Sequence, residues 1–140
     1  MSVVLGYDES PGAARALRIA VEVAAAFGER LVLVYGAAAP GPVGEEYTSH
    51  HEAIRQAGRT GLEHAVAEAD RAGVPTVVEV IDDKPDQALI EAAARHAARV
   101  IVVGTWGESP MRGALLGSTP HKLLHLSTVP VLCVPPEERP

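Results

Sequence analysis

Five short apolar runs recur along the chain and alternate with longer segments of helical pattern. The runs are rich in Val, Ile and Leu without polar alternation, which is typical of strands buried on both faces of a parallel sheet. Between them, apolar residues recur at the three- and four-residue intervals of an amphipathic helix. The expected strands are Ser2–Tyr7, Leu31–Tyr35, Thr76–Ile81, Val100–Val103 and Val129–Val134.

The expected helices fill the gaps between these strands, over Gly12–Phe27, Glu45–Arg71, Asp86–Ala97 and Thr119–Leu126. Strict alternation with right-handed crossovers predicts an α/β fold, a doubly wound, Rossmann-like parallel sheet of five strands between two layers of helices. Ligands of such sheets bind off the carboxyl ends of the strands at the switch point. We expect a single domain over residues 1–140, with a mobile loop at 36–50 and a disordered tail at 135–140.

The charge and cysteine content exclude several classes of protein. A net charge of −6 argues against nucleic acid held by phosphate neutralisation, and against an anionic membrane surface. No apolar run approaches the length of a membrane span, and the N-terminus enters a strand pattern without a basic leader. We therefore expect a cytoplasmic protein.

Cys133 is the single cysteine and lies in an apolar run, so we expect a buried, inert thiol.

A glycine pattern follows the fourth expected strand. Gly104 ends that strand, Gly107 comes three residues later, and Gly117-Ser118 opens the next helix. Glycines let a ligand approach the backbone, and a helix N-terminus offers free N–H groups to an anion. The residue directly before Ser118 is glycine and not lysine, so the pattern is not a Walker A loop. It is also not the dinucleotide motif G-x-G-x-x-G. The sequence therefore predicts a phosphate cradle that contains no lysine.

On this motif the chain resembles the universal stress protein family, specifically its ATP-binding branch, which carries G-x2-G-x9-G-S/T. The opening strand that ends in Gly6-Tyr7-Asp8 and the terminal VPVLCVP segment add to the resemblance. The resemblance implies strand order 3-2-1-4-5, as in adenine nucleotide alpha hydrolase-like folds. It also implies a bound adenine nucleotide, ATP or else ADP or AMP, often with Mg²⁺ or Mn²⁺.

The resemblance also implies roles for individual residues. Gly104 and Gly107 would line the ribose and phosphates, and the phosphates would be held by Gly117, Ser118 and Thr119. Gly6 would be one of the nucleotide-binding residues, and Asp8, two residues later, would lie near the ribose or the metal, with Mg²⁺ bound mainly through the phosphates. Gly36 would read the adenine edge through its backbone, with Val103 flanking it. Pro120 departs from the family pattern because proline has no N–H, which predicts a weaker hold on the terminal phosphate.

Several residues have a second interpretation. Asp8 fits an Asx-type turn that caps the first helix. Arg112 could swing onto a phosphate or remain solvated, and Trp106 could pack over the ribose or shield its loop. His121 and His125 have a spacing that can bind metal, but no third ligand is evident. Turn chemistry and helix capping explain Asp82-Asp83 better than acid–base catalysis does.

The resemblance implies an adenine-nucleotide-binding stress-response regulator, and we expect nucleotide occupancy to order the loops Gly36–Gly44 and Trp106–Arg112. A slow ATPase or nucleotide hydrolase is the alternative, although no nucleophile–base set can be assembled. The third hypothesis is a nucleotide-independent interaction module. Val129–Val134 would be an apolar sheet edge, and such edges pair readily, so we expect a homodimer through this strand. The regulatory partner is not identifiable from the sequence.

Overall fold

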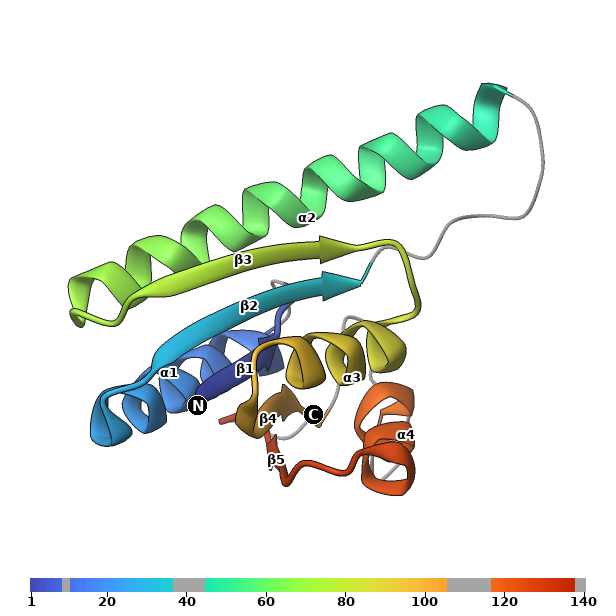
Figure 1. Cartoon of the computed structure of the whole chain (residues 1–140). Helices are drawn as coiled ribbons and strands as arrows, with labels where there is room; N and C mark the ends of the chain where they lie inside the picture. The colour runs from blue at the N-terminus through green and yellow to red at the C-terminus, as the bar shows by residue number, and fades with distance from the viewer. Residues whose placement is uncertain (9–10, 37–44, 106–116, 138–140) are drawn as a thin grey trace.

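The computed structural model describes residues 1–8, 11–36, 45–105 and 117–137, and in this part of the chain all the expected strands form one parallel sheet. The strand order is β3-β2-β1-β4-β5, as the resemblance implied (Figure 1). The strands are β1 (Ser2–Gly6), β2 (Arg30–Gly36), β3 (Thr76–Ile81), β4 (Ala98–Gly104) and β5 (Val131–Val134).

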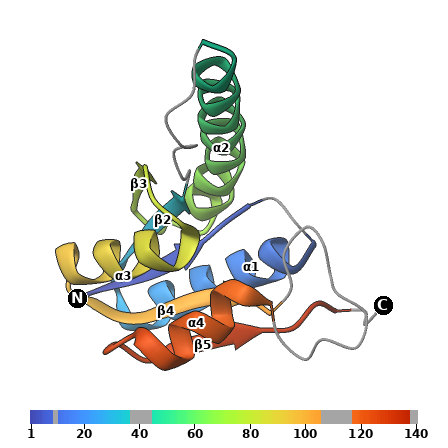
Figure 2. The same ribbon diagram turned by 90° about the vertical axis from the view of Figure 1, so that its right-hand side faces the viewer.

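Helices cover both faces of the sheet and make the three layers of a doubly wound fold. They are α1 (Pro11–Phe27), α2 (Glu45–Arg71), α3 (Pro85–Arg95) and α4 (Ser118–Leu126). In both views α2 lies beside the edge strand β3, and α4 lies at the opposite edge of the sheet beside β5 (Figure 2). None of the helices in the described ranges is both long enough and apolar enough to cross a membrane.

The core is divided by the sheet into two apolar clusters. Alternate strand residues point to opposite faces, so Val3 and Leu5 pack with α1 and α2, whereas Val4 packs with α3 and α4. All three of these side chains are fully buried. Burial on both faces explains why the strands appear in the sequence as continuous apolar runs.

Several element boundaries differ from the sequence expectation by one or two residues, and two of these differences have a clear physical cause. Helix α3 ends at Arg95 rather than Ala97, because Ala97 adopts a φ of 50°, a left-handed conformation that cannot continue a helix. Strand β5 begins after Pro130 rather than at Val129. Proline has no N–H for a strand ladder, but its carbonyl oxygen accepts a hydrogen bond of 2.9 Å from the Ile101 N–H.

The segment after β5 packs back onto helix α1. The Arg15 guanidinium donates a hydrogen bond of 2.7 Å to the Pro135 carbonyl, and Arg18 forms an ion pair with Glu137. The disordered tail that we expected at 135–140 thus includes three residues that contact α1, namely Pro135, Pro136 and Glu137, whereas 138–140 lie outside the described residues.

Candidate functional site

The switch point of this fold lies between β1 and β4, which are neighbours in the sheet. The connection after β1 runs through α1 on one face, and the connection that leads into β4 runs through α3 on the other. Gly6 and Gly104 end these two strands, so the structure brings both predicted residues together at the carboxyl end of the sheet. This is the place where α/β sheets bind their ligands.

Glycines at the carboxyl ends of the strands allow close backbone approach. A Cβ atom on Gly104 would lie 3.0 Å from the carbonyl carbon of Gly12, in the first turn of α1. A Cβ atom on Gly36 would lie 2.8 Å from the Cα atom of Pro85, where α3 begins. Backbone atoms cannot move aside cheaply, so both positions require glycine for space.

Gly6 is packed from one side by the core. A Cβ atom there would lie 3.0 Å from the Leu89 side chain and 3.4 Å from a methyl carbon of Val103. The Val103 side chain is 3% exposed and belongs to the α3–α4 side of the core. Any ligand at the carboxyl ends of β1 and β4 would therefore meet the backbone of Val103 and not its side chain.

The start of α4 is attached to the end of β4 through backbone hydrogen bonds. The Gly117 N–H donates to the Thr105 carbonyl at 2.6 Å, and a Cβ atom on Gly117 would lie 2.9 Å from the same oxygen. The Thr105 N–H in turn donates to the Val134 carbonyl at 3.0 Å. Thr105 thus holds the helix N-terminus beside the carboxyl ends of β4 and β5.

The first turn of α4 presents donors without an intrahelical partner. Gly117 is the N-cap residue, and the first helical N–H to be bonded is that of His121, which donates to the Gly117 carbonyl at 3.1 Å. Pro120 has no N–H, so the N–H groups of Ser118 and Thr119 remain for a ligand, together with their hydroxyls. Ser118 is exposed and Thr119 is half-buried. The helix dipole adds to the attraction for an anion.

Asp8 lies half-buried just beyond the end of β1. The ranges described contain no group of three or more His, Cys, Asp or Glu residues that could enclose a metal ion. Mg²⁺ keeps several waters and often binds through one carboxylate and substrate phosphates. A single carboxylate such as Asp8 fits that requirement, whereas a cage made entirely of protein ligands is not present among these residues.

Two predicted site residues, Gly107 and Arg112, lie outside the described residues, as does Trp106. Conversely, sequence reasoning missed Gly12 and Thr105, which the structure places against Gly104 and Gly117. Their signals were weak, since Gly12 merely follows a helix-starting proline and Thr105 merely follows a strand-ending glycine.

The turn before α3 does not cap the helix as we expected. The Asp83 carboxylate accepts a hydrogen bond of 2.8 Å from the Lys84 N–H, which is turn chemistry. The N-cap residue is Lys84, and there is no side-chain capping hydrogen bond to the first turn of α3. The prediction that Asp82-Asp83 caps this helix is therefore wrong.

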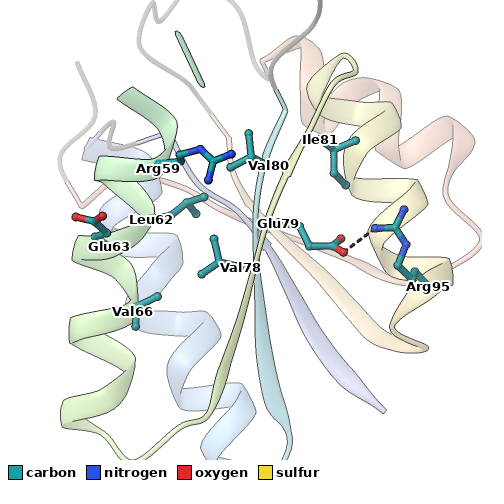
Figure 3. A pocket seen from close by; sticks show the side chains of 9 residues that line it. All are labelled: Arg59, Leu62, Glu63, Val66, Val78, Glu79, Val80, Ile81 and Arg95. Atoms are coloured by element: carbon teal, nitrogen blue, oxygen red, sulfur yellow. Dashed lines mark hydrogen bonds and ion pairs between the residues drawn. The ribbon is translucent and has the colours of Figure 1, made fainter. Parts of the chain in front are cut away.

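A groove of about 580 Å³ opens between α2 and the edge strand β3, away from the switch point (Figure 3). None of the predicted nucleotide-binding residues lines this groove. Glu79, on its rim, accepts a hydrogen bond of 2.6 Å from Arg95 and lies 3.2 Å from the His96 ring. Burial raises the pKa of Glu79, but these two partners outweigh burial, so its pKa lies below the ordinary value. Arg59 and Arg95 line this groove together with Glu63 and Glu79, so the four charged side chains cancel and leave no net positive charge to attract a phosphate.

Comparisons with known proteins show the family to which this fold and sequence are similar. A model of the universal stress protein family matches residues 1–135. A universal stress protein of Thermus aquaticus is 33% identical over 136 residues, which cover 95% of this chain and 97% of that protein. One of Mycobacterium tuberculosis is 30% identical over 132 residues, 93% of this chain but 44% of that protein, so the chain spans less than half of this relative. A solved universal stress protein in complex with cAMP has a TM-score of 0.76 at 28% identity, and the match covers 96% of each chain.

Proposed function

The chain belongs to the universal stress protein family, and from this premise we propose that it binds an adenine nucleotide at the carboxyl ends of β1 and β4. The observation that carries the proposal is the position of the N-terminus of α4. Thr105 holds it at the carboxyl end of the sheet by accepting a 2.6 Å hydrogen bond from the Gly117 N–H. Its two free N–H groups and two hydroxyls, at Ser118 and Thr119, suit phosphate oxygens. The cAMP complex of a family member supports an adenine nucleotide as the ligand.

Within this proposal, the phosphates bind to Ser118 and Thr119, the ribose lies near Gly104, and the backbone of Gly36 contacts the adenine. ATP is the principal ligand, in keeping with the ATP-binding branch of the family. ADP and AMP compete well, because Pro120 offers no N–H to the terminal phosphate. Mg²⁺ is held through the phosphates, with Asp8 as a protein ligand.

We further propose that the nucleotide acts as a regulatory ligand and not as a substrate. Backbone N–H groups and hydroxyls bind a phosphate but do not take a proton from water, whereas fast phosphoryl transfer also needs a positioned base or added cationic groups. A site of this kind keeps ATP bound and lets occupancy control a surface that a partner contacts. Because the chain spans less than half of its mycobacterial relative, this role is proposed for the domain alone.

Calorimetric titration of protein stripped of co-purified ligand tests the proposal. ATP, ADP, AMP and cAMP are titrated in turn, with GTP as the control for base selectivity. We expect saturable heat with ATP and weaker or no heat with GTP. No heat with any adenine nucleotide would overturn the proposal.

We also propose that the chain forms a homodimer through the outer edge of β5. Leu132 on this strand is 38% exposed, and Leu124 and Leu126 on the adjacent α4 are more than half exposed. The other sheet edge, β3, carries the charged Glu79 in its centre, and central charges oppose edge-to-edge pairing. An isologous pair across a two-fold axis would bury the leucines.

Light scattering of matched variants tests the dimer. Leu132→Lys is expected to give the monomer mass, because a charge would lie at the centre of the interface. Val78→Lys places the same charge on β3, where Val78 is 45% exposed, and is expected to leave the dimer intact. A monomeric wild type, or a dimer that only the change on β3 dissociates, would contradict this assignment.

A further inference from the structure

Two histidines lie one turn apart on the solvent side of α4. Helix α4 buries Pro120 and Leu123, whereas His121 and His125 are exposed. Residues four apart are neighbours on one helix face. The two ring centroids are 4.9 Å apart, and the rings meet edge to face at 71°.

Packing and capping do not account for this pair. Neither ring is in the core, and no hydrogen bond joins either ring to a residue within the described ranges. His125 lies in the last turn, where a cationic side chain complements the helix dipole. His121 lies nearer the N-terminus, where that argument does not apply. The feature to be explained is therefore a second imidazole placed beside the first.

We propose that His121 and His125 form a surface site for Cu²⁺. Histidines at i and i+4 on a helix can bind a single metal ion, as in zinc-binding helices. Of the divalent first-row ions, Cu²⁺ binds imidazole nitrogen most strongly, and its tetragonal geometry is complete with water in the remaining positions. A structural Zn²⁺ site would require four protein ligands, and the described residues contain no such group around this helix.

The present ring orientation is compatible with chelation. Both side chains are exposed, so each ring can rotate from the edge-to-face contact to direct a nitrogen at a shared ion without leaving a packed position. The ion would link successive turns of a helix that has only nine residues. Binding to the folded state alone would therefore stabilise the helix. The site does not depend on nucleotide binding.

Titration with CuCl₂ in a non-coordinating buffer, followed by electron paramagnetic resonance and calorimetry, tests the site. The wild type is expected to bind one Cu²⁺ with a spectrum that shows two imidazole nitrogens. His125→Ala is expected to weaken this binding at least about tenfold. The sequence also contains the adjacent pair His50-His51 and an α-amino group, and all variants retain these background ligands.

A relocation variant is the matched control. Lys122→His combined with His125→Ala keeps the number of histidines on α4 but places them next to each other, where they do not share a face. We expect it to bind Cu²⁺ as weakly as His125→Ala, with a normal helical spectrum in circular dichroism. Equal affinity and equal resonance spectra for the wild type and the relocation variant would overturn the proposal.

Discussion

Gly28 and Gly73 stand where helices lead into the amino ends of β2 and β3, whereas Gly36 and Gly104 stand at the carboxyl ends of β2 and β4. The first pair has φ angles of 64° and 73°, and a Cβ atom on either would meet nothing within 4 Å. The second pair has no positive φ, but a Cβ atom would lie within 3.0 Å of backbone. At the amino end of the sheet, glycine is therefore needed for its left-handed backbone conformation. At the carboxyl end, it is needed because there is no room for a side chain.

The side chains around these glycines follow the same division. At the amino end, the Arg99 guanidinium donates two hydrogen bonds to Glu29, at 2.9 and 2.6 Å, and lies 4.1 Å from the centre of the Phe27 ring. At the carboxyl end, backbone contacts bring α1 and α4 against β4. The comparison teaches that changes at the amino end should alter stability alone, whereas changes at the carboxyl end should also alter ligand binding.

The largest expected effect is that of Gly36→Val. Its Cβ atom would lie 2.8 Å from the Cα of Pro85, so the start of α3 must shift. We expect a loss of about 2–3 kcal/mol in the free energy of unfolding, and weaker ATP binding because the end of β2 is displaced. Urea denaturation and calorimetry measure the two effects. Stability and affinity equal to the wild type would contradict the requirement for space.

Pro120→Ala should raise the affinity for ATP, although it also costs some stability because the Pro120 ring is buried. The alanine restores an N–H in the first turn of α4, and one added hydrogen bond to a phosphate is worth about 1 kcal/mol. ATP should bind about fivefold more tightly relative to AMP than in the wild type. Titration of both nucleotides gives the ratio. An unchanged ratio would show that this position does not face the terminal phosphate.

Glu29→Gln should act on stability alone, and in a pH-dependent way. The hydrogen bond from Arg99 lowers the pKa of Glu29 below its ordinary 4.5, although burial opposes the shift. A lowered folded-state pKa stabilises the protein above the unfolded value, and this stability is lost as the pH falls through the folded value. The variant should unfold at a lower temperature than the wild type at neutral pH, and the difference should narrow below pH 4.5. A difference that widens in acid, or weaker ATP binding by the variant, would count against this division.

The smallest effect is expected for Gly28→Asn. Asparagine tolerates a positive φ better than other residues with a side chain, and nothing lies within 4 Å of the new Cβ atom. The free energy of unfolding should change by less than about 0.5 kcal/mol, with ATP affinity unchanged. Urea denaturation checks this value, and a loss as large as that of Gly36→Val would remove the contrast between the two ends.

The sequence predicts local features of this fold well. Continuous apolar runs such as Leu31–Tyr35 identify buried strands, because only strands covered on both faces lack polar alternation. The strand order was implied by the family resemblance, and the structure confirms it. The end of α3 was missed, since the left-handed Ala97 lacks the glycine that marks the ends of α1 and α2.

The candidate site was predictable in its residue types but not in its contacts. The Gly117-Ser118 step predicts a helix N-terminus. The hydrogen bond that attaches this N-terminus to Thr105 depends on how β4 and α4 meet in space. The approach of Gly12 to Gly104, and of Pro85 to Gly36, likewise joins segments far apart in the chain. A spacing pattern contains no information about such neighbours.

The central claim is that the first turn of α4 binds the phosphates of an adenine nucleotide, and Ser118→Asp tests it most directly. A carboxylate is favourable at a helix N-terminus, so the variant should unfold at or above the wild-type temperature, yet it repels phosphate. Thr128→Asp, just beyond the other end of α4, is the matched control. The account predicts that calorimetry will show ATP binding at least about tenfold weaker in Ser118→Asp and unchanged in Thr128→Asp. Wild-type affinity in a folded Ser118→Asp protein would contradict it.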